Sequence, residues 1–435
     1  MKYPAISNQL FIHNRQQFVK MLKPKSLAIF HSHDEMPKSA DSTFAFSQNR
    51  DILYLSGIDQ EDTILMLFPE CPNPLWREIL FVKRTNETIA IWEGHKYTKE
   101  EATLASGIKK VMWTEEFDGM LRLLMHQADN VYLNLNEHDR ATWRQSYKDL
   151  DFAHRMQREY PLHNYNRLGP IMHVLRSCKH PVEIELMQRA ADITEAAFRR
   201  VCKFVKPGVT EYEIEAEISH EFIRSRATGH AYTPIIASGK NACVLHYIEN
   251  NMPCNDGEII LMDFGAEYAN YAADLTRCIP VNGKFTTRQK QIYQAVLHVM
   301  KGAKQMLVTG NNWDDYHTAV GKMMTEQLLQ IGLITSADCS KDDWQNEPWN
   351  ENKAYRKYFM HGTSHYLGLD VHDVGSRYQT FRPGNVFTCE PGIYIPEENI
   401  GIRLENDILI TESGNFDLMR NIPLEIEEIE EAMRA

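Results

Sequence analysis

Residues 259–281 read IILMDFGAEYANYAADLTRCIPV, in which two apolar, β-rich runs flank a short polar stretch. This pattern predicts an antiparallel hairpin. Strict pairing about Tyr268–Ala269 would place Asp263 opposite Asp274, with Cβ atoms roughly 5 Å apart, where like charges repel. Two ionised carboxylates among apolar strand residues are costly unless they are paired or bind a cation. The alternative is that one Asp bonds to a turn and the other pairs with Arg277.

A second hairpin is predicted from residues 386–411, which read VFTCEPGIYIPEENIGIRLENDILIT. Here Glu390 and Glu405 lie nearly opposite each other across a turn at residues 396–399. A pair of carboxylates in each hairpin indicates a site for two divalent metal ions. Oxygen-rich sites suit Mn²⁺, our first candidate, or Co²⁺ and Fe²⁺, with Zn²⁺ as a further option. Two such ions about 3.5–4 Å apart can activate a shared water and polarise a carbonyl, which is hydrolytic chemistry.

One imidazole accompanies these carboxylates. His365 lies in FMHGTSHYLGLDVHDVG, residues 359–375. The spacing of His361 and His365 is that of the zinc motif HExxH, but Gly362 stands where the motif needs its catalytic glutamate. The sequence therefore argues against a helical zinc-protease site.

These residues, in this order and context, resemble the ligand set of the M24 metallopeptidases of the pita-bread fold. Within that family the greatest similarity is to the bacterial aminopeptidase P group, and it rests on the segments SGKNACVLHYIEN, HGTSHYLGLDVHDVG, EPGIYI and GIRLENDILIT. Residues 39–57, SADSTFAFSQNRDILYLSG, resemble the N-terminal domain that aminopeptidase P and prolidase share.

The resemblance implies a role for each metal-binding candidate. Asp263 would be a ligand of one ion, His365 and Glu390 would be ligands of the other, and Asp274 and Glu405 would bridge the two. Glu390 would also handle the proton of the nucleophilic water, as a carboxylate can if it reaches that water.

The remaining catalytic candidates surround these ligands. His246, His361 and His372 match histidines that line the family's active site and stabilise the tetrahedral intermediate. Arg403 lies two residues before Glu405 on the same strand face, where it could bond to a bridging carboxylate. A buried core histidine at position 246 and a structural arginine at 403 are the plainer alternatives.

The resemblance implies an aminopeptidase that releases the N-terminal residue from Xaa-Pro-Xaa peptides. A dipeptidase for Xaa-Pro, as in prolidase, is the second option, because the two activities share metals and N-terminal domain. A non-catalytic pita-bread binding module is the third, and the presence of all five ligand types argues against it. Family members often form dimers or tetramers, so we expect a homo-oligomer.

We expect an α+β chain of two domains, with an N-terminal α/β domain at residues 1–170 and a catalytic pita-bread domain at residues 171–435. In the N-terminal half, NRQQFVKML predicts a helix, and SLAIF, DTILMLF, REILFVK and TIAIWEG predict strands. Asp41 and Trp92 could border a cleft, although a turn Asp and a packed Trp are the simpler interpretations.

The catalytic half contains an internal parallel. Helices at about 182–228 precede the aspartate hairpin, and helices at about 286–332 precede the glutamate hairpin. Capping boxes, Thr210 with Glu213 and Thr286 with Gln289, support both helical blocks. This order predicts a duplicated unit whose two sheets face each other across the metals. The acidic tail EIEEIEEAM is expected to be a short docking helix or a solvated end.

Composition narrows the class of protein further. The net charge of −12 without a basic cluster argues against nucleic-acid binding. The eight cysteines include no CxxC pair, which favours a reduced, cytoplasmic setting. No apolar run approaches the 18 or so residues of a membrane span, so no membrane association is expected.

Overall fold

The computed structural model describes residues 3–138, 140–141, 146–344, 350 and 352–434. It divides into two compact units, Pro4–Arg176 and a unit that comprises Ser177–Ala435 together with Tyr3. Each unit mixes helices and strands, which confirms the predicted class. The predicted boundary between residues 170 and 171 falls inside helix α7 (Gly169–Ser177), near whose end the two units divide.

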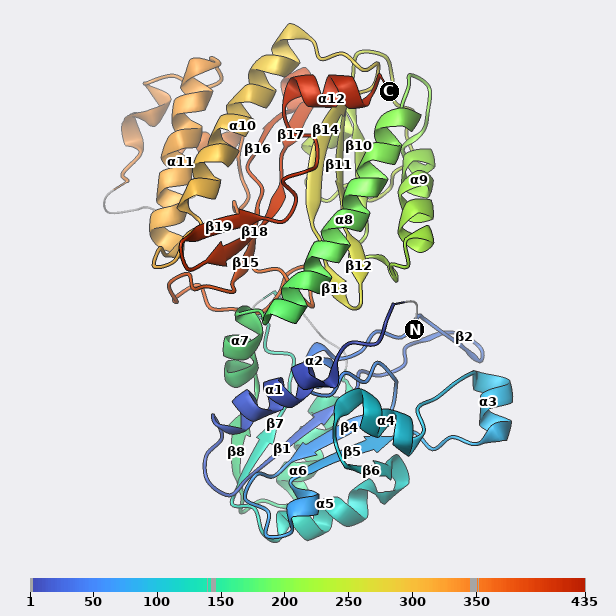
Figure 1. The fold of residues 1–435 in the computed structure, drawn as a ribbon. Coiled ribbons are helices and arrows are strands. Elements are labelled where there is room, and N and C mark those ends of the chain that lie inside the picture. The colour runs from blue at the N-terminus through green and yellow to red at the C-terminus, as the bar shows by residue number, and fades with distance from the viewer. Residues whose placement is uncertain (1–2, 139, 142–145, 345–349, 351, 435) are drawn as a thin grey trace. The chain divides into compact units, whose positions relative to one another are not determined.

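The N-terminal unit is built on a six-stranded sheet with strand order β6-β5-β4-β1-β7-β8. The strands are β1 (Ser26–His31), β4 (Ile64–Leu67), β5 (Glu78–Val82), β6 (Lys110–Trp113), β7 (Asn130–Leu133) and β8 (Asn164–Arg167). Alternate residues of this sheet, among them Leu27, Ile29 and Phe81, form a core with apolar residues of α5 (Phe117–Met125) and α6 (Lys148–Glu159). Figure 1 shows α1 (Asn8–Val19), α2 (Arg50–Ser56) and α4 (Lys99–Ser106) on the other side of the sheet. The predicted α/β layers are therefore present.

Two predictions in this unit concern exposed segments. The segment TIAIWEG is not a strand but belongs to helix α3 (Glu87–Glu93), because Asn86 Oδ1 accepts a hydrogen bond from the Ile89 N–H at 2.9 Å and Gly94, at φ 79°, ends the helix. Trp92 is 84% exposed, so the prediction of a packed Trp is wrong. Asp41 is exposed in the turn between β2 (Pro37–Ser39) and β3 (Ser42–Thr43), as expected of a turn Asp.

The second unit repeats the predicted order of two helices followed by a hairpin. Helices α8 (Pro181–Phe204) and α9 (Glu211–Arg224) precede β11 (Ile259–Phe264) and β14 (Leu275–Pro280). Helices α10 (Thr287–Met306) and α11 (Trp313–Gln330) precede β15 (Val386–Cys389) and β18 (Asn406–Thr411). Figure 1 shows the strands between α8 and α9 on one side and α10 and α11 on the other. Both predicted capping boxes are present at the starts of α9 and α10.

Short sheets form the centre of this unit, in the orders β10-β11-β14, β13-β12-β9, β15-β18-β19 and β16-β17, and the candidate residues lie on these strands or in the segments between them. The further strands are β9 (Gly229–His230), β10 (Ile235–Ser238), β12 (Ala266–Tyr268), β13 (Tyr271–Ala272), β16 (Gly392–Ile395), β17 (Ile400–Arg403) and β19 (Gly414–Asp417).

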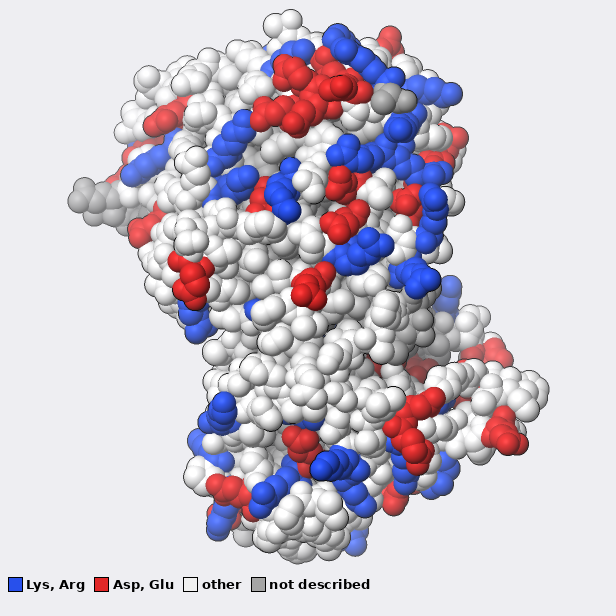
Figure 2. Space-filling model, in the orientation of Figure 1, with Lys and Arg blue, Asp and Glu red and all other residues white. Residues whose placement is uncertain are grey.

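The acidic tail forms helix α12 (Ile426–Ala432), which buries Ile426 and Ile429 and is therefore the docking helix expected. Figure 2 shows acidic side chains gathered over this helix, whose first turn carries Glu427 and Glu428. Among the described residues, no helix combines the length and the apolar character needed to cross a membrane.

Candidate metal centre

The aspartate hairpin turns one residue later than predicted. Its turn is at Ala269–Asn270, where φ is 53° and 67°, as in a two-residue type I′ turn. This register pairs Asp263 with Thr276, so the predicted pairing of Asp263 with Asp274 is wrong. Asn accepts a left-handed backbone more readily than most residues, which favours a turn that includes Asn270 over one centred on Tyr268–Ala269.

Asp274 lies in a gap between β13 and β14, and the register places it opposite Gly265. Its backbone N–H donates to Asp407 Oδ2 at 3.1 Å rather than to a strand partner. A Cβ atom on Gly265 would lie 1.7 Å from the backbone oxygen of Ala273. Only glycine at position 265 therefore permits the two backbone segments of the hairpin to approach closely beside Asp274.

Tyr232 brings the two aspartates together. Its hydroxyl lies 2.5 Å from Oδ1 of Asp263 and 2.5 Å from Oδ1 of Asp274. Burial, and then the charges of both aspartates, raise the pKa of Tyr232 well above its usual range, so the hydroxyl keeps its proton. One proton can be donated to only one carboxylate, so the second contact requires another proton or a cation.

The glutamate hairpin has the predicted register. β15 pairs with β18, and β16 pairs with β17, in one continuous register that places Glu390 opposite Glu405 between the two ladders. In the same gap the Leu404 N–H donates to the Pro391 backbone oxygen at 3.2 Å. Glu405 is 2% exposed, so its charge lies away from water.

His365 is held beside this hairpin by its backbone and by its ring. Its backbone N–H donates to Thr388 Oγ1 at 3.1 Å, and its oxygen accepts from the Thr388 N–H at 3.0 Å. Ring atom Nδ1 lies 2.9 Å from the Tyr366 backbone oxygen, and because a carbonyl can only accept, Nδ1 carries the proton. Nε2 therefore faces Asp274 Oδ2 at 3.4 Å and Glu390 Oε1 at 3.5 Å.

The two hairpins and His365 form one cluster of potential ligands. One ligand atom each from Asp274, His365 and Glu405 lies within 4.8 Å of the others. Asp263 joins this group through Tyr232, and Glu390 joins it through His365.

The pKa values of these groups are shifted because the groups are buried next to one another. Burial raises the pKa of Glu390 to about 7, and it also raises the pKa of Asp263 and, by a larger amount, that of Glu405. Burial lowers the pKa of His365, but its bond to Asp274 and the charge of Glu390 outweigh that effect and raise it. Each of the four groups is thus shifted towards binding a positive charge. A set of four carboxylates and one imidazole fits hard divalent cations.

Arg403 supplies a buried positive charge at the edge of the cluster. Its Nη2 atom lies 2.5 Å from Asp263 Oδ2, and Nε donates to Thr276 Oγ1 at 3.0 Å. Thr276 Oγ1 in turn donates to Glu405 Oε2 at 2.6 Å. The expected bond to a bridging carboxylate is therefore indirect, through Thr276, and the direct partner is Asp263.

The hydrogen bonds of Arg277 are directed away from both aspartates. Its guanidinium donates to the backbone oxygens of Pro423, Thr276 and Glu405 and to the side chain of Asn406. The alternative of an Asp–Arg277 ion pair is not supported by this arrangement.

A chain of hydrogen bonds runs from Asp263 through Arg403 and Tyr394 to His361. Arg403 Nη1 donates to the Tyr394 hydroxyl at 2.9 Å, and that hydroxyl lies 2.7 Å from His361 Nε2. His361 Nδ1 lies 2.7 Å from the Gly362 oxygen, so Nδ1 carries the proton and Nε2 accepts from Tyr394. Burial and the charge of Arg403 lower the pKa of His361 to about 3, so the ring is neutral near pH 7.

The other two predicted histidines lie on different segments of the site. The ring of His372 meets that of His365 edge-on, with centroids 4.4 Å apart. His246 is exposed in the loop after the 3₁₀ helix η3 (Gly239–Cys243), so it is not a buried core histidine. Its charge contributes, after burial and the charges of Arg403 and Arg356, to the lowered pKa of His361. The structure thus brings all three near the cluster.

Three residues of the site were missed from the sequence: Tyr232, Thr276 and Tyr394. Thr276 would have been found with the correct hairpin register, because it is the strand partner of Asp263. Tyr232 lies just before β10, which pairs with β11 and aligns Ile235 with Asp263. A buried aromatic hydroxyl has no sequence pattern of its own, so only the fold reveals its partner.

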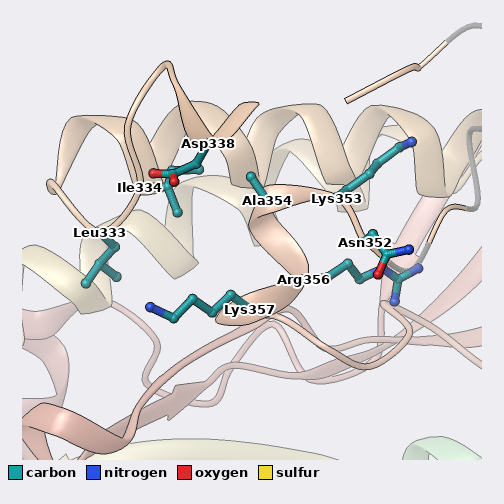
Figure 3. Close-up of a pocket in the computed structure, with 8 residues that line it drawn as sticks. All are labelled: Leu333, Ile334, Asp338, Asn352, Lys353, Ala354, Arg356 and Lys357. Atoms are coloured by element: carbon teal, nitrogen blue, oxygen red, sulfur yellow. The ribbon is translucent and has the colours of Figure 1, made fainter. Parts of the chain in front are cut away.

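A separate cavity of about 470 Å³ adjoins the 3₁₀ helix η5 (Ala354–Lys357). Figure 3 shows Asp338 and Ile334 on one side of it and Lys357 on the other, with Arg356 and Lys353 close by. The described residues that line this cavity include none of the predicted ligands. It is therefore distinct from the carboxylate cluster.

Comparisons with known proteins agree with this geometry. The sequence pattern of metallopeptidase family M24 matches residues 185–412, and that of the aminopeptidase P N-terminal domain matches residues 11–132. The chain is 35% identical to the Xaa-Pro aminopeptidase of Escherichia coli, over 99% of this chain and 98% of that protein.

Solved structures give the same relationship. Zinc-substituted Escherichia coli aminopeptidase P in complex with product matches with a TM-score of 0.86 and 33% identity, over 99% of both chains. Pseudomonas aeruginosa aminopeptidase PepP matches with a TM-score of 0.88 and 29% identity, over 99% of this chain and 98% of that one. These neighbours confirm the pita-bread fold with its additional N-terminal domain.

Proposed function

Because the chain belongs to metallopeptidase family M24, we propose that it is an Xaa-Pro aminopeptidase, which releases the N-terminal residue from peptides with proline in second position. The observation that carries the proposal is the orientation of His365, whose Nδ1–H is directed at the Tyr366 oxygen so that Nε2 faces two carboxylates in a buried cluster. Buried carboxylates are costly without a positive charge beside them, so this arrangement favours either a proton on Nε2 or a bound metal ion at that position. The Escherichia coli enzyme, similar over 98% of its length, carries the same activity in its name.

We assign the metal ligands by position in the family. Asp263 would serve as a ligand of one ion, His365 and Glu390 would serve the other, and Asp274 and Glu405 would serve both. Mn²⁺ is our candidate for both ions, since oxygen ligands predominate. When bound, two such ions lower the pKa of a shared water and polarise the scissile carbonyl.

The chain's own residues would orient and protonate the substrate. Glu390 lies opposite Glu405, with its Oε2 atom 3.8 Å from His361 Nδ1, and would take a proton from the attacking water. The prolyl nitrogen carries no N–H in the substrate and leaves as an amine, so it must receive a proton, which Glu390 can return. His246 and His372 would contact the peptide, and Arg403 with Tyr394 would hold Asp263 and His361 in place.

Substrate length separates this proposal from the dipeptidase alternative. After reconstitution with Mn²⁺, the protein would be given Xaa-Pro, Xaa-Pro-Xaa and Xaa-Ala-Xaa peptides, and the products identified by mass spectrometry. We expect release of the first residue from Xaa-Pro-Xaa alone. Cleavage restricted to Xaa-Pro would support prolidase, cleavage of Xaa-Ala-Xaa would support a general aminopeptidase, and no cleavage would support a binding module.

Two further assignments do not depend on the site: the compartment is inferred from the cysteines and the assembly from the family. We propose that the protein is cytoplasmic and that it forms a homo-oligomer, a dimer or a tetramer. Its eight cysteines are all free thiols in the structure, as a reducing compartment would leave them. Light scattering coupled to gel filtration would give the number of chains in the assembly.

A further inference from the structure

Glu211, the first residue of α9, is a buried carboxylate that the proposed reaction does not use. It is 0% exposed, and five hydrogen bonds end on its two oxygens. Oε1 accepts from the N–H and the hydroxyl of Ser238 at 2.8 and 2.7 Å and from Asn241 Nδ2 at 3.1 Å. Oε2 accepts from the Tyr247 hydroxyl at 2.7 Å and from the Met252 N–H at 3.0 Å. The N-terminus of α9 also favours a negative charge at this position.

These five bonds tie together the two ends and the middle of residues 238–252. Ser238 ends strand β10, Met252 lies at the far end, and Tyr247 lies between them. Tyr247 is 8% exposed, whereas its neighbour His246 is exposed. Because an exposed loop gains little from packing, its conformation depends on such hydrogen bonds.

A second glutamate of the same helix holds the loop at another point. Glu215 lies one turn after Glu211, and its Oε2 atom accepts from Asn250 Nδ2 at 2.8 Å. Asn250 also accepts from the Ile236 N–H at 2.9 Å and donates to the Pro234 oxygen at 3.0 Å. Asn250 is 3% exposed, so these bonds are shielded from water. The loop is thus fixed on both sides of His246 by one helix and one strand.

The same helix and strand reach the candidate metal centre. Strand β10, which ends at Ser238, pairs with β11 and aligns Ile235 with Asp263. Glu211 therefore joins the backbone beside a candidate ligand to the loop that carries His246. A shift of this loop would move His246 relative to Asp263.

We propose that Glu211 is a positioning residue, which through Tyr247 fixes the exposed loop so that His246 is held against the substrate peptide. The proposal rests on the proposed function for the contact between His246 and the peptide. The anchoring of the loop by Glu211 does not depend on it.

A double-mutant cycle tests whether Tyr247 acts through His246. The variants are Tyr247→Phe, His246→Ala and the double variant, each assayed on an Xaa-Pro-Xaa peptide with Mn²⁺. A hydrogen bond to a charged group contributes about 1.5–3 kcal/mol, so we expect Tyr247→Phe to lower kcat/KM by about tenfold or more. In the His246→Ala background the same change should alter kcat/KM by less than about twofold, because the two residues act as a unit. Equal losses in both backgrounds would overturn the proposal.

A matched control removes a different buried hydroxyl. Tyr293 is 0% exposed and donates to the Leu424 oxygen at 2.7 Å, a contact outside the candidate site. Tyr293→Phe should leave kcat/KM within about twofold of the native value. A loss equal to that of Tyr247→Phe would mean that either change acts by general destabilisation, against the proposal.

Hydrogen exchange gives a readout that needs no activity. In Tyr247→Phe and in Glu211→Gln, backbone amides of residues 243–249 should exchange faster than in the native chain, while bound Mn²⁺ is unchanged. Unchanged exchange in both variants would overturn the anchoring. Faster exchange in a protein that cleaves no Xaa-Pro-Xaa peptide would support the anchoring and count against the proposed function, so the two failures are distinguishable.

Discussion

At the scale of single residues, Asp274 connects the two hairpins. Its side chain lies with His365 and Glu405, and its backbone N–H bonds to Asp407 on the strand that follows Glu405. Because Asp274 lies outside the regular strands, its backbone N–H is not needed by a strand partner and the residue can face the second hairpin.

Removing this carboxylate should reduce the number of metal ions that the site holds. In Asp274→Ala, we expect bound Mn²⁺ to fall by at least one ion per chain and kcat/KM to fall by about 100-fold or more, because even residues that only orient metal ligands are worth 10–100-fold. Metal content is measured by plasma mass spectrometry after dialysis. Asp256→Ala, at an exposed position, is the control and should match the native protein. A full complement of metal and activity in Asp274→Ala would refute the ligand assignment.

Gly265 should tolerate no side chain. An added Cβ would lie 1.7 Å from the Ala273 oxygen, so Gly265→Ala must displace the chain just before Asp274. We expect a loss of about 1–3 kcal/mol in the free energy of unfolding, measured in urea, together with weaker Mn²⁺ binding. Gly229→Ala on β9 is a matched control, since a Cβ there would meet nothing within 4 Å. Equal stabilities of the two variants would contradict this explanation.

At the scale of elements, the start of α8 contains a carboxylate with an unusual titration. Glu183 is 2% exposed; its Oε2 accepts from the His180 N–H at 2.8 Å, and its Oε1 accepts from the Tyr271 hydroxyl at 3.0 Å. Burial raises its pKa from the usual 4.5 to about 7. The folded protein therefore holds this proton more tightly than the unfolded chain does.

This shift predicts a pH-dependent stability. Protonated Glu183 contributes about 3 kcal/mol to the free energy of unfolding, at 1.36 kcal/mol per pKa unit. This contribution is fully present below about pH 4.5 and is lost as the pH rises through about 7. Glu183→Gln, which stays neutral, should remove this part of the decline in urea unfolding between pH 5 and 8. Glu185→Gln, at an exposed position of the same helix, should retain it. Identical slopes in all three proteins would show that Glu183 is not the cause.

Local signals explain which elements could be predicted from the sequence. Helices α8 to α11 and both hairpins were predicted because the signals for their caps, periodicity and turns lie in residues close together in the sequence. The same local chemistry was overlooked at Asn86 and Gly94, which make α3 a helix. The register of the aspartate hairpin was missed because the choice between two adjacent turns depends on the left-handed conformation of Asn270. Tyr232 and Tyr394 were missed because their partners lie on other strands.

At the scale of the whole molecule, two compact units predict two unfolding steps. The candidate ligands all belong to the unit that begins at Ser177, so only that unit should respond to metal. A ligand present at 100 times its Kd stabilises the fold that binds it by about 2.7 kcal/mol. Calorimetry should therefore show one transition that Mn²⁺ raises and a chelator lowers, beside another that does not move. A shift of both transitions, or of neither, would contradict the assignment.

The shared register of the glutamate ladders has a consequence for how this chain can change over generations. The turn at residues 396–399 lies beyond the last paired positions, Ile395 and Ile400, so extra residues can accumulate there without altering which side chains meet. One extra residue between Cys389 and Gly392 would turn the following side chains to the opposite face and separate Glu390 from Glu405. Insertions and deletions in descendants of this sequence should therefore occur at the turn, residues 396–399, and not between Cys389 and Gly392.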